Sequence, residues 1–390
     1  METIAPVPFP DAPRLDPPDD DEVRLIVGGY NGALATGHPL TDVQRAVIDA
    51  LTESMTGRAV DVATATPVGP RELAEGLARR DHRFRTRIFQ TILLAELLLV
   101  PLPREVSERV EQYAAWLGVC DDMQRVARDV ARGSLGLALM DFRRSGYFEH
   151  LLATPPDHLH ASDALEDAWQ FACDDAALAR RWADLEDCPA GSLGHEVWKF
   201  YRARGFTFPG LPQSAPPTLA QHDWVHVLAD YGSTVECEIE VFGFIARAND
   251  DPRAFSLLAM VLGLFETGYL HDAANLFEYD RGHLSRDARR MATRLADAMY
   301  RGAMVGTYLD AHGRCADTDL LTIDWFAHAS RPIDAVRADF GVLPKSAAAI
   351  GAGSVSPWER GGISPFQLGQ GRAAAEAAGR AYDSYGASVA

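Results

Sequence analysis

The segment QHDWVHVLADYGSTVECEIE, residues 221–240, places His222 and His226 four positions apart. On a helix this spacing puts both side chains on one face, about 6 Å apart, so that two imidazoles can reach one ion. Asp223 flanks the same face and can add an oxygen ligand. The first half of the segment therefore predicts a helix with three candidate metal ligands.

Glu238 can join these ligands only if the chain reverses direction. On a straight helix it would lie about 18 Å along the axis from His226, which is out of reach of the same ion. The residues Asp230-Tyr231-Gly232 are predicted to end the first helix, with the glycine in the left-handed conformation, and Ser233-Thr234 to begin a second. We therefore expect an antiparallel helical hairpin that brings Glu238 back to the histidines.

Two neighbouring glutamates are given other roles. Ser233 and Glu236 have capping-box spacing, which predicts a structural role for Glu236 at the start of the second helix. Glu240 is two residues beyond Glu238 and points roughly the other way. The predicted ligand set is therefore His222, Asp223, His226 and Glu238.

Nitrogen and carboxylate ligands together favour zinc, with iron or manganese as alternatives, over calcium or magnesium. Another interpretation needs no metal. In it, the histidines and carboxylates form a solvated polar face on an ordinary helical hairpin.

Outward from this segment, the periodicity of the chain is helical. Apolar residues recur at three- and four-residue spacing, and no alternating strand pattern of useful length is present, so we predict an all-α fold. The clearest helical segments are 41–55, 70–78, 84–99, 105–118 and 122–146. Pro70 and Pro103 are at predicted helix starts, where proline is tolerated.

The composition suggests how the chain is divided. Residues 1–22 are predicted to be a disordered arm rich in Pro and Asp, 23–153 a helical N-terminal domain, and 346–390 a flexible tail rich in Ala and Gly. The segment TPPDHLHASD, residues 154–163, is predicted to link two helical domains.

Charge and cysteine content exclude several classes of protein. The formal net charge of -18 argues against nucleic-acid binding and against attraction to an anionic membrane surface. Five scattered cysteines without a CxxC pair predict neither a disulfide framework nor a zinc ribbon. No signal peptide is recognised, and the longest apolar runs are too short to span a bilayer. We expect a cytoplasmic protein.

The histidine motif resembles that of a known family. HDWVH followed by eleven residues and Glu238 is similar to the HDxxH-x11-E signature of the coenzyme Q protein four family of ubiquinone biosynthesis. DCPAGSLGHEVWKFYRARGF (187–206) resembles an upstream family segment, and DLLTIDWFAHASRPIDAVRADFGV (319–342) resembles its C-terminal segment. The resemblance covers residues 165–343, which we expect to form the metal-binding helical domain.

This resemblance implies an all-α fold with a bound divalent cation, usually zinc, beside a groove for a polyprenyl chain. It carries the ligand roles to His222, Asp223, His226 and Glu238. It also implies ring decarboxylation of a prenylated aromatic acid, or a scaffold role in a membrane-associated quinone-biosynthesis complex. The chain departs from the family before the motif, where PPTLAQHD replaces an Arg-rich lead. The N-terminal block loosely resembles TerB-like helical domains.

Apolar and basic side chains after the hairpin are candidates for substrate binding. The run 255–265 is apolar enough to line a prenyl groove, although a helix core is the alternative, and nearby arginines could hold a carboxylate. The candidates are Leu257, Met260, Val261, Leu264, Arg290 and Arg294. His195, His283 and the pair His271-Asp272 lack partners at ligand spacing and are not assigned to a site.

Three classes of function remain open. The first is a metal-dependent decarboxylase or lyase acting on an amphipathic, prenylated aromatic substrate. The second is a non-catalytic lipid-binding scaffold in which four protein ligands close a structural metal site. The third is an HD-type phosphohydrolase, which the short spacing between His222 and His226 disfavours. We also expect a homo-oligomer, with peripheral membrane or complex association as an alternative to a free cytoplasmic protein.

Overall fold

A computed structural model describes residues 18–134, 138, 175–212, 214–215, 217–249, 254–269 and 281–389. The prediction of an all-α fold is confirmed. In these ranges helices are the regular secondary structure, and strand-like pairing is limited to one isolated bridge between Ser192 and Pro332. The predicted linker 154–163 lies outside the described residues.

The chain divides into two compact units, and each contains two stretches of sequence. Unit 1 comprises Met1–Glu149 and Asp250–Tyr300, and unit 2 comprises His150–Asn249 and Arg301–Ala390. Residues 250–300 were expected in the metal-binding domain, so the observed division differs from the predicted boundary. The physical reason is that the apolar helix α14 (Ala254–Leu262) packs on a helix of unit 1, where the Arg87 guanidinium lies 3.7 Å from the Phe255 ring centroid.

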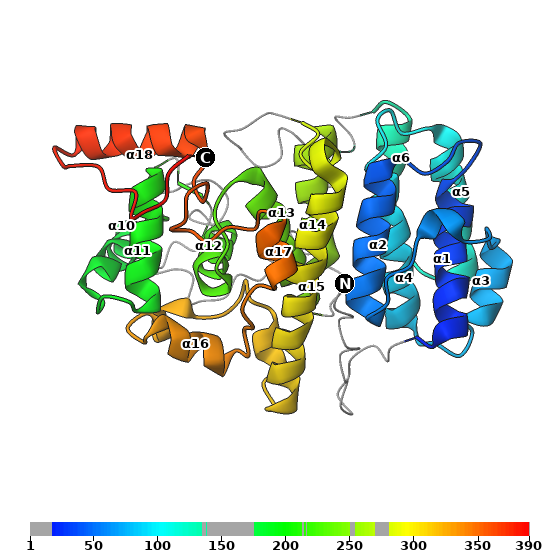
Figure 1. Ribbon diagram of the computed structural model, residues 1–390, viewed down its shortest axis with the longest axis horizontal. Helices are drawn as coiled ribbons and strands as arrows, with labels where there is room; N and C mark the ends of the chain where they lie inside the picture. Colours follow the sequence, from blue (N-terminus) through cyan, green and yellow to red (C-terminus); the bar gives the residue numbers. More distant parts are fainter. Residues whose placement is uncertain are drawn as a thin grey trace. The chain divides into compact units, whose positions relative to one another are not determined.

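Unit 1 is a bundle of helices, drawn in blue and cyan for its N-terminal part in Figure 1. Its other helices are α1 (Asp20–Leu34), α2 (Asp42–Thr56), α3 (Pro70–Gly76), α4 (His82–Glu96), α5 (Arg104–Leu117), α6 (Met123–Ala131) and the first half of α15 (Ala288–Ala311). The boundaries of α2 to α5 follow the predicted segments closely. Among the described residues, no helix is both long and apolar enough to cross a membrane.

Helix α1 begins inside the arm that was predicted to be disordered. Asp19 caps it by accepting the amides of Asp21 and Glu22, and Glu22 completes a capping box. The acidic cluster that suggested disorder is therefore a helix start, because carboxylates in the first turn interact favourably with the helix dipole. Gly28 allows the helix to approach its neighbour, since a Cβ there would lie 2.6 Å from the Thr66 carbonyl oxygen.

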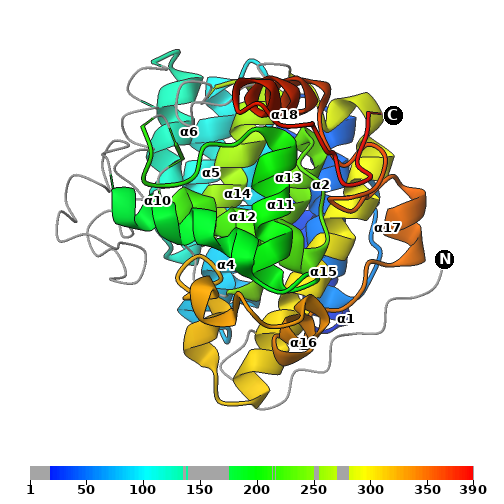
Figure 2. The same cartoon turned by 90° about the vertical axis from the view of Figure 1, so that its left-hand side faces the viewer.

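Unit 2 contains the predicted hairpin and the C-terminal part of the chain. Its helices are α10 (Ala176–Ala183), α11 (Leu193–Arg204), α12 (Pro217–Ala229), α13 (Val235–Ala248), the second half of α15, α16 (Ile333–Asp339), α17 (Ala347–Gly351) and α18 (Pro365–Ala377). Helices α11, α12 and α13 lie together in Figure 2, and the hairpin is formed by α12 and α13.

The C-terminal end of α12 is held by three basic side chains from later in the sequence. Unpaired carbonyl groups at a helix end are partly negative, so cationic donors stabilise them. The bonds run from Arg301 to Ala229 O at 2.8 Å, from Arg337 to Leu228 O at 2.9 Å, and from Lys345 to Asp230 O at 2.7 Å. The orientation of α12 is therefore fixed from outside the hairpin.

The prediction of a flexible tail over residues 346–390 is wrong for its described part. Helix α18 lies across the C-terminal end of α11 (Figure 1), and Ile363, Leu368 and Ala387 form a buried cluster with Ala203. Small residues permit this close contact, because a Cβ at Gly371 would lie 2.2 Å from the Ala203 carbonyl oxygen. The Ala- and Gly-rich composition of this C-terminal segment therefore reflects close helix packing rather than disorder.

The C-terminal segment also holds the turn between α12 and α13. The Gly232 amide donates to the Val355 carbonyl at 2.9 Å, and the Ser233 amide donates to the Gly362 carbonyl at 2.9 Å. Glycine is required at 232 for contact rather than conformation, since a Cβ there would lie 2.8 Å from the Gly362 backbone. The left-handed residue of the turn is Asp230, with φ of 65°, which corrects the prediction that Gly232 adopts that conformation.

Candidate metal centre

The hairpin brings together side chains that are sixteen residues apart in the sequence. Among the described residues, His222, His226 and Glu238 form the group whose ligand atoms all lie within 4.8 Å of one another. His226 is fully buried and His222 is mostly buried, so the interpretation as a solvated polar face is wrong. Both helices of the predicted hairpin contribute, as the spacing required.

The distances in this group suit a small divalent cation. Glu238 Oε2 lies 3.4 Å from His222 Nε2 and 3.3 Å from His226 Nε2. Zinc-to-nitrogen bonds of about 2.05 Å at tetrahedral angles place neighbouring ligand atoms about 3.3 Å apart. The observed separations therefore match two edges of a tetrahedral site.

The orientation of both imidazoles is set by backbone carbonyl groups. His226 Nδ1 lies 2.7 Å from the Gly232 carbonyl oxygen, and His222 Nδ1 contacts the Leu219 carbonyl oxygen. A protonated Nδ1 that donates to a carbonyl leaves Nε2 with its lone pair, which is the arrangement seen in metal-binding histidines. His226 Nε2 is buried and has no hydrogen-bond partner in the described part of the chain. The fit of the donor set to a cation rests on this atom and on the matching distances.

Aromatic rings pack against each imidazole. The Phe242 ring stacks on His222 with centroids 5.1 Å apart, and the Phe200 ring stacks on His226 at 5.4 Å. These contacts restrict the side-chain rotamers of both histidines. The site is thus organised before any ion binds.

Asp223 is placed differently from the other predicted ligands. Its Oδ1 lies 3.6 Å from His222 Nε2, and it does not belong to the group of three converging ligand atoms. Its Oδ2 accepts a hydrogen bond of 2.6 Å from the Tyr201 hydroxyl, donated from α11. Tyr201 was not among the residues predicted for the site. It lies on α11 and Asp223 on α12, and a spacing pattern within one helix does not reveal a contact between two helices.

The charges of the site shift the pKa values of its members. Burial would lower the pKa of His222, but Asp223 and Glu238 outweigh it and raise that pKa to about 9. Burial would raise the pKa of Glu238, but the two histidines hold it well below its usual range. Burial raises the pKa of Asp223. Glu238 is therefore an anion that favours positive charge at the histidines, whether a proton or a metal ion supplies it.

The predicted capping role of Glu236 is wrong. The N-cap of α13 is Thr234, and it makes no side-chain capping bond. The Ser233 hydroxyl instead donates to Gln367 Oε1 at 2.6 Å and accepts from the buried guanidinium of Arg204. The capping-box pattern fails because a tertiary contact with α18 engages the serine.

The predicted substrate residues belong to unit 1, whereas the histidine group belongs to unit 2. Val261 on α14 is buried, Arg294 is buried and Arg290 is exposed. Leu257 and Met260 are on α14, and Leu264 is in the π-helical turn Gly263–Thr267 that follows it. A prenyl groove lined by these residues stays a prediction.

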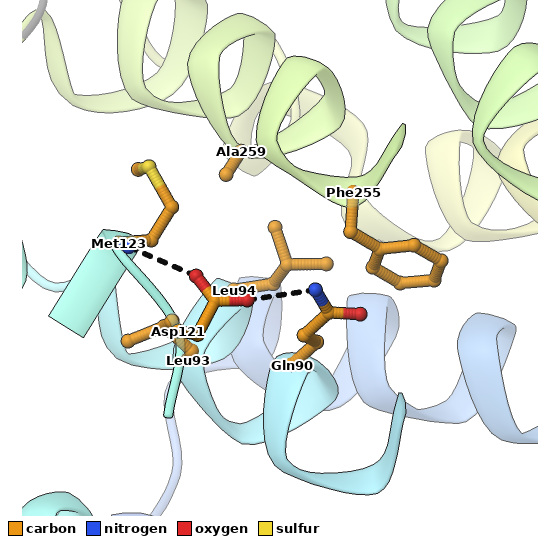
Figure 3. Close-up of a pocket in the computed structure, with 7 residues that line it drawn as sticks. All are labelled: Gln90, Leu93, Leu94, Asp121, Met123, Phe255 and Ala259. Atoms are coloured by element: carbon orange, nitrogen blue, oxygen red, sulfur yellow. Dashed lines mark hydrogen bonds between the residues drawn. The ribbon is translucent and has the colours of Figure 1, made fainter. Parts of the chain in front are cut away.

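A small pocket in unit 1 provides no substrate site. Figure 3 shows Asp121 in it, accepting hydrogen bonds from the Gln90 side chain at 2.7 Å and from the Met123 amide at 2.9 Å. The remaining lining residues are Leu93, Leu94, Phe255 and Ala259. Its cavity volume of about 10 Å³ is room for roughly one water molecule, far below that of a ligand pocket.

Comparisons of the chain with protein-family models, curated proteins and solved structures found no match. The geometry of the site and the histidine motif are therefore the features that bear on function.

Proposed function

We propose that unit 2 holds one divalent cation, with zinc preferred over iron and manganese, on His222, His226 and Glu238. The observation that carries this proposal is the convergence of three ligand atoms, in which Glu238 Oε2 lies at tetrahedral spacing from both Nε2 atoms and the buried Nε2 of His226 forms no hydrogen bond among the described residues. A metal ion would satisfy that atom and balance the charge of Glu238. Such an ion supplies Lewis acidity toward an oxygen of a bound molecule.

Three protein ligands support a catalytic role over a purely structural one. Structural zinc sites are closed by four protein ligands, whereas catalytic sites use three and leave one position open. The two-histidine, one-carboxylate set belongs to the second type. Glu238 retains 18% side-chain exposure, so the site is accessible on the Glu238 side, while His226 is sealed.

The residues of this chain would divide the work between binding and orientation. His222 and His226 present Nε2 because their Nδ1 atoms are bound to carbonyl groups, and stacked rings prevent them from turning away. Glu238 supplies the negative charge. Asp223 and Tyr201 form a buried hydrogen-bonded pair beside the proposed ligands.

The substrate is proposed from the motif. HDWVH-x11-E resembles the signature of the coenzyme Q protein four family, which supports an amphipathic, prenylated aromatic acid as substrate and loss of its ring carboxyl group as the reaction. A carboxylate or phenolic oxygen on the ring suits the open position of a three-ligand site. The reaction class is therefore a metal-dependent decarboxylase or lyase of quinone-type metabolism.

The test combines metal analysis with mass spectrometry of small molecules extracted from the full-length protein. We expect one zinc ion per chain and a co-purifying prenylated aromatic compound. Metal without any such compound, together with four protein ligands in the metal-bound form, would favour the scaffold alternative. Hydrolysis of phosphate esters would favour the phosphohydrolase.

A matched pair of histidine variants controls for effects on folding. His226→Ala should abolish metal binding, because it removes a ligand and leaves the others without their partner. His312→Ala removes an exposed histidine at the end of α15 and should keep the full metal content. Equal metal content in the two variants would contradict the proposed centre.

A further inference from the structure

We propose that Asp223 is not a metal ligand but an outer carboxylate, which Tyr201 holds beside the open coordination position, where it accepts a hydrogen bond from an O–H or N–H of the bound molecule. This inference rests on the proposed metal centre and assigns a role to a residue that the motif alone would place among the ligands.

One oxygen of the Asp223 carboxylate is already engaged in a hydrogen bond. Oδ2 accepts the Tyr201 hydroxyl at 2.6 Å, which is the distance of a strong hydrogen bond to a carboxylate. Movement of Oδ2 onto the ion, alone or together with Oδ1, would break this bond in a buried environment. The cost of leaving the tyrosine hydroxyl without a partner opposes that movement.

The Tyr201 side chain is held in place and cannot follow such a movement. It is 1% exposed, and its ring packs 4.9 Å from Trp182 and 5.5 Å from Phe208, measured between ring centroids. Trp182 also contacts Trp224, the residue after Asp223, at 5.4 Å. The aromatic cluster therefore fixes the donor and the backbone of the acceptor together.

The remaining oxygen of the Asp223 carboxylate is Oδ1. Oδ1 lies 3.6 Å from His222 Nε2, outside hydrogen-bond distance, on the His222 side of the three converging ligand atoms. It can therefore accept a hydrogen bond from a group that occupies the fourth position. A carboxylate there favours ligands that carry a hydrogen beside their donor oxygen, such as hydroxamic acids and ring hydroxyls, over bare anions.

The experiment uses the full chain loaded with cobalt(II), whose visible absorption reports the coordination number. Four proteins are compared after circular dichroism has verified their folding: wild type, Asp223→Asn, Tyr201→Phe and His226→Ala. Each is measured for cobalt content and titrated with acetohydroxamic acid and with acetate. The hydroxamic acid carries N–H and O–H hydrogens, and acetate carries none.

Asp223→Asn should retain the cobalt content of the wild type, whereas His226→Ala should lose it. Because the asparagine amide would present a donor where the carboxylate accepted, the preference for acetohydroxamic acid over acetate should fall at least about tenfold. Tyr201→Phe should release Asp223 onto the ion, which raises the coordination number and weakens the visible absorption.

Loss of cobalt from folded Asp223→Asn would overturn this inference and leave the metal centre standing, with aspartate as its fourth ligand. An unchanged ligand preference in that variant would overturn it as well. An unchanged spectrum in Tyr201→Phe would do the same, and this near-isosteric variant serves even if Asp223→Asn does not fold. A wild-type protein that binds no cobalt would overturn both this inference and the proposed function.

Discussion

Glu96 in unit 1 and Glu238 in unit 2 are both helical glutamates whose side chains are largely shielded from solvent. Their pKa values nevertheless shift in opposite directions. Glu96 is 1% exposed on α4, and burial raises its pKa to about 8, partly offset by a hydrogen bond with Ser107. Glu238 faces two histidines, which outweigh burial and lower its pKa. The first glutamate is neutral at pH 7 and the second is an anion.

The difference shows that burial alone does not make a carboxylate functional. Glu96 interrupts an apolar run. Burial and the nearby Glu111 carboxylate both raise its pKa, so the protonated form costs less free energy to bury than the charged form. Glu238 keeps 18% side-chain exposure and has two imidazole nitrogens within 3.4 Å. Convergent partners, rather than burial alone, distinguish Glu238, the proposed ligand, from a core residue.

The strongest test of this comparison exchanges each glutamate for its neutral isostere. Glu238→Gln should weaken zinc binding on the order of 1,000-fold, since outer-shell changes already cost 10- to 100-fold and this change alters a ligand. Glu96→Gln should leave zinc affinity unchanged. Competition with a chromophoric chelator measures both affinities. Similar losses in the two variants would show that general burial of charge, not ligation, controls metal binding.

The second test uses the dependence of unfolding free energy on pH. Because the pKa of Glu96 is raised on folding, its contribution to stability is complete below the unfolded value near 4.5 and is lost as pH rises toward 8. Between pH 5 and pH 7 this loss amounts to roughly 2 to 3 kcal/mol. Glu96→Gln should remove that loss, as measured by hydrogen exchange at α4 in urea. A wild-type curve without this slope would contradict a neutral Glu96.

The third test addresses the turn that makes the partners converge. Gly232→Ala places a Cβ 2.8 Å from the Gly362 backbone, so it should destabilise unit 2 by about 2 kcal/mol and weaken zinc binding, because Glu238 is displaced with the turn. Thermal unfolding and zinc affinity measure the two effects.

Gly351→Ala is the matched control, because a Cβ at that position on α17 meets nothing within 4 Å. It should have wild-type zinc affinity and no loss of stability. Equal behaviour of the two alanine variants would show that the turn does not depend on its contact with the C-terminal segment.

The smallest effect is expected for Glu236, which is half-buried near the start of α13. Glu236→Gln removes one negative charge two residues from Glu238 without removing a ligand. We expect zinc affinity and unfolding free energy to change by no more than about 0.5 kcal/mol. A large loss of zinc affinity in this variant would mean that the total negative charge near the hairpin, rather than the convergence of His222, His226 and Glu238, controls zinc binding.

The helical class, the positions of α2 to α5 and the approach of Glu238 to His222 and His226 could be predicted from the sequence, whereas Asp223 was predicted as a fourth ligand and does not converge with them. These features are local: apolar periodicity sets a helix, and the spacing of His222 and His226 sets their common face. The return of Glu238 also followed from the chain, because a straight helix would put it out of reach.

Other features depend on contacts between separate helices and were seen first in the folded chain. Tyr201 reaches Asp223 from another helix, and Ser233 binds Gln367 instead of capping α13. The segment after residue 345 is ordered because its small residues fit closely against α11 and the Gly232 turn. Local pattern cannot reveal such contacts, because their free energy comes from the shape and hydrogen bonding of partners on other helices, 22 residues apart for Tyr201 and Asp223 and 134 for Ser233 and Gln367.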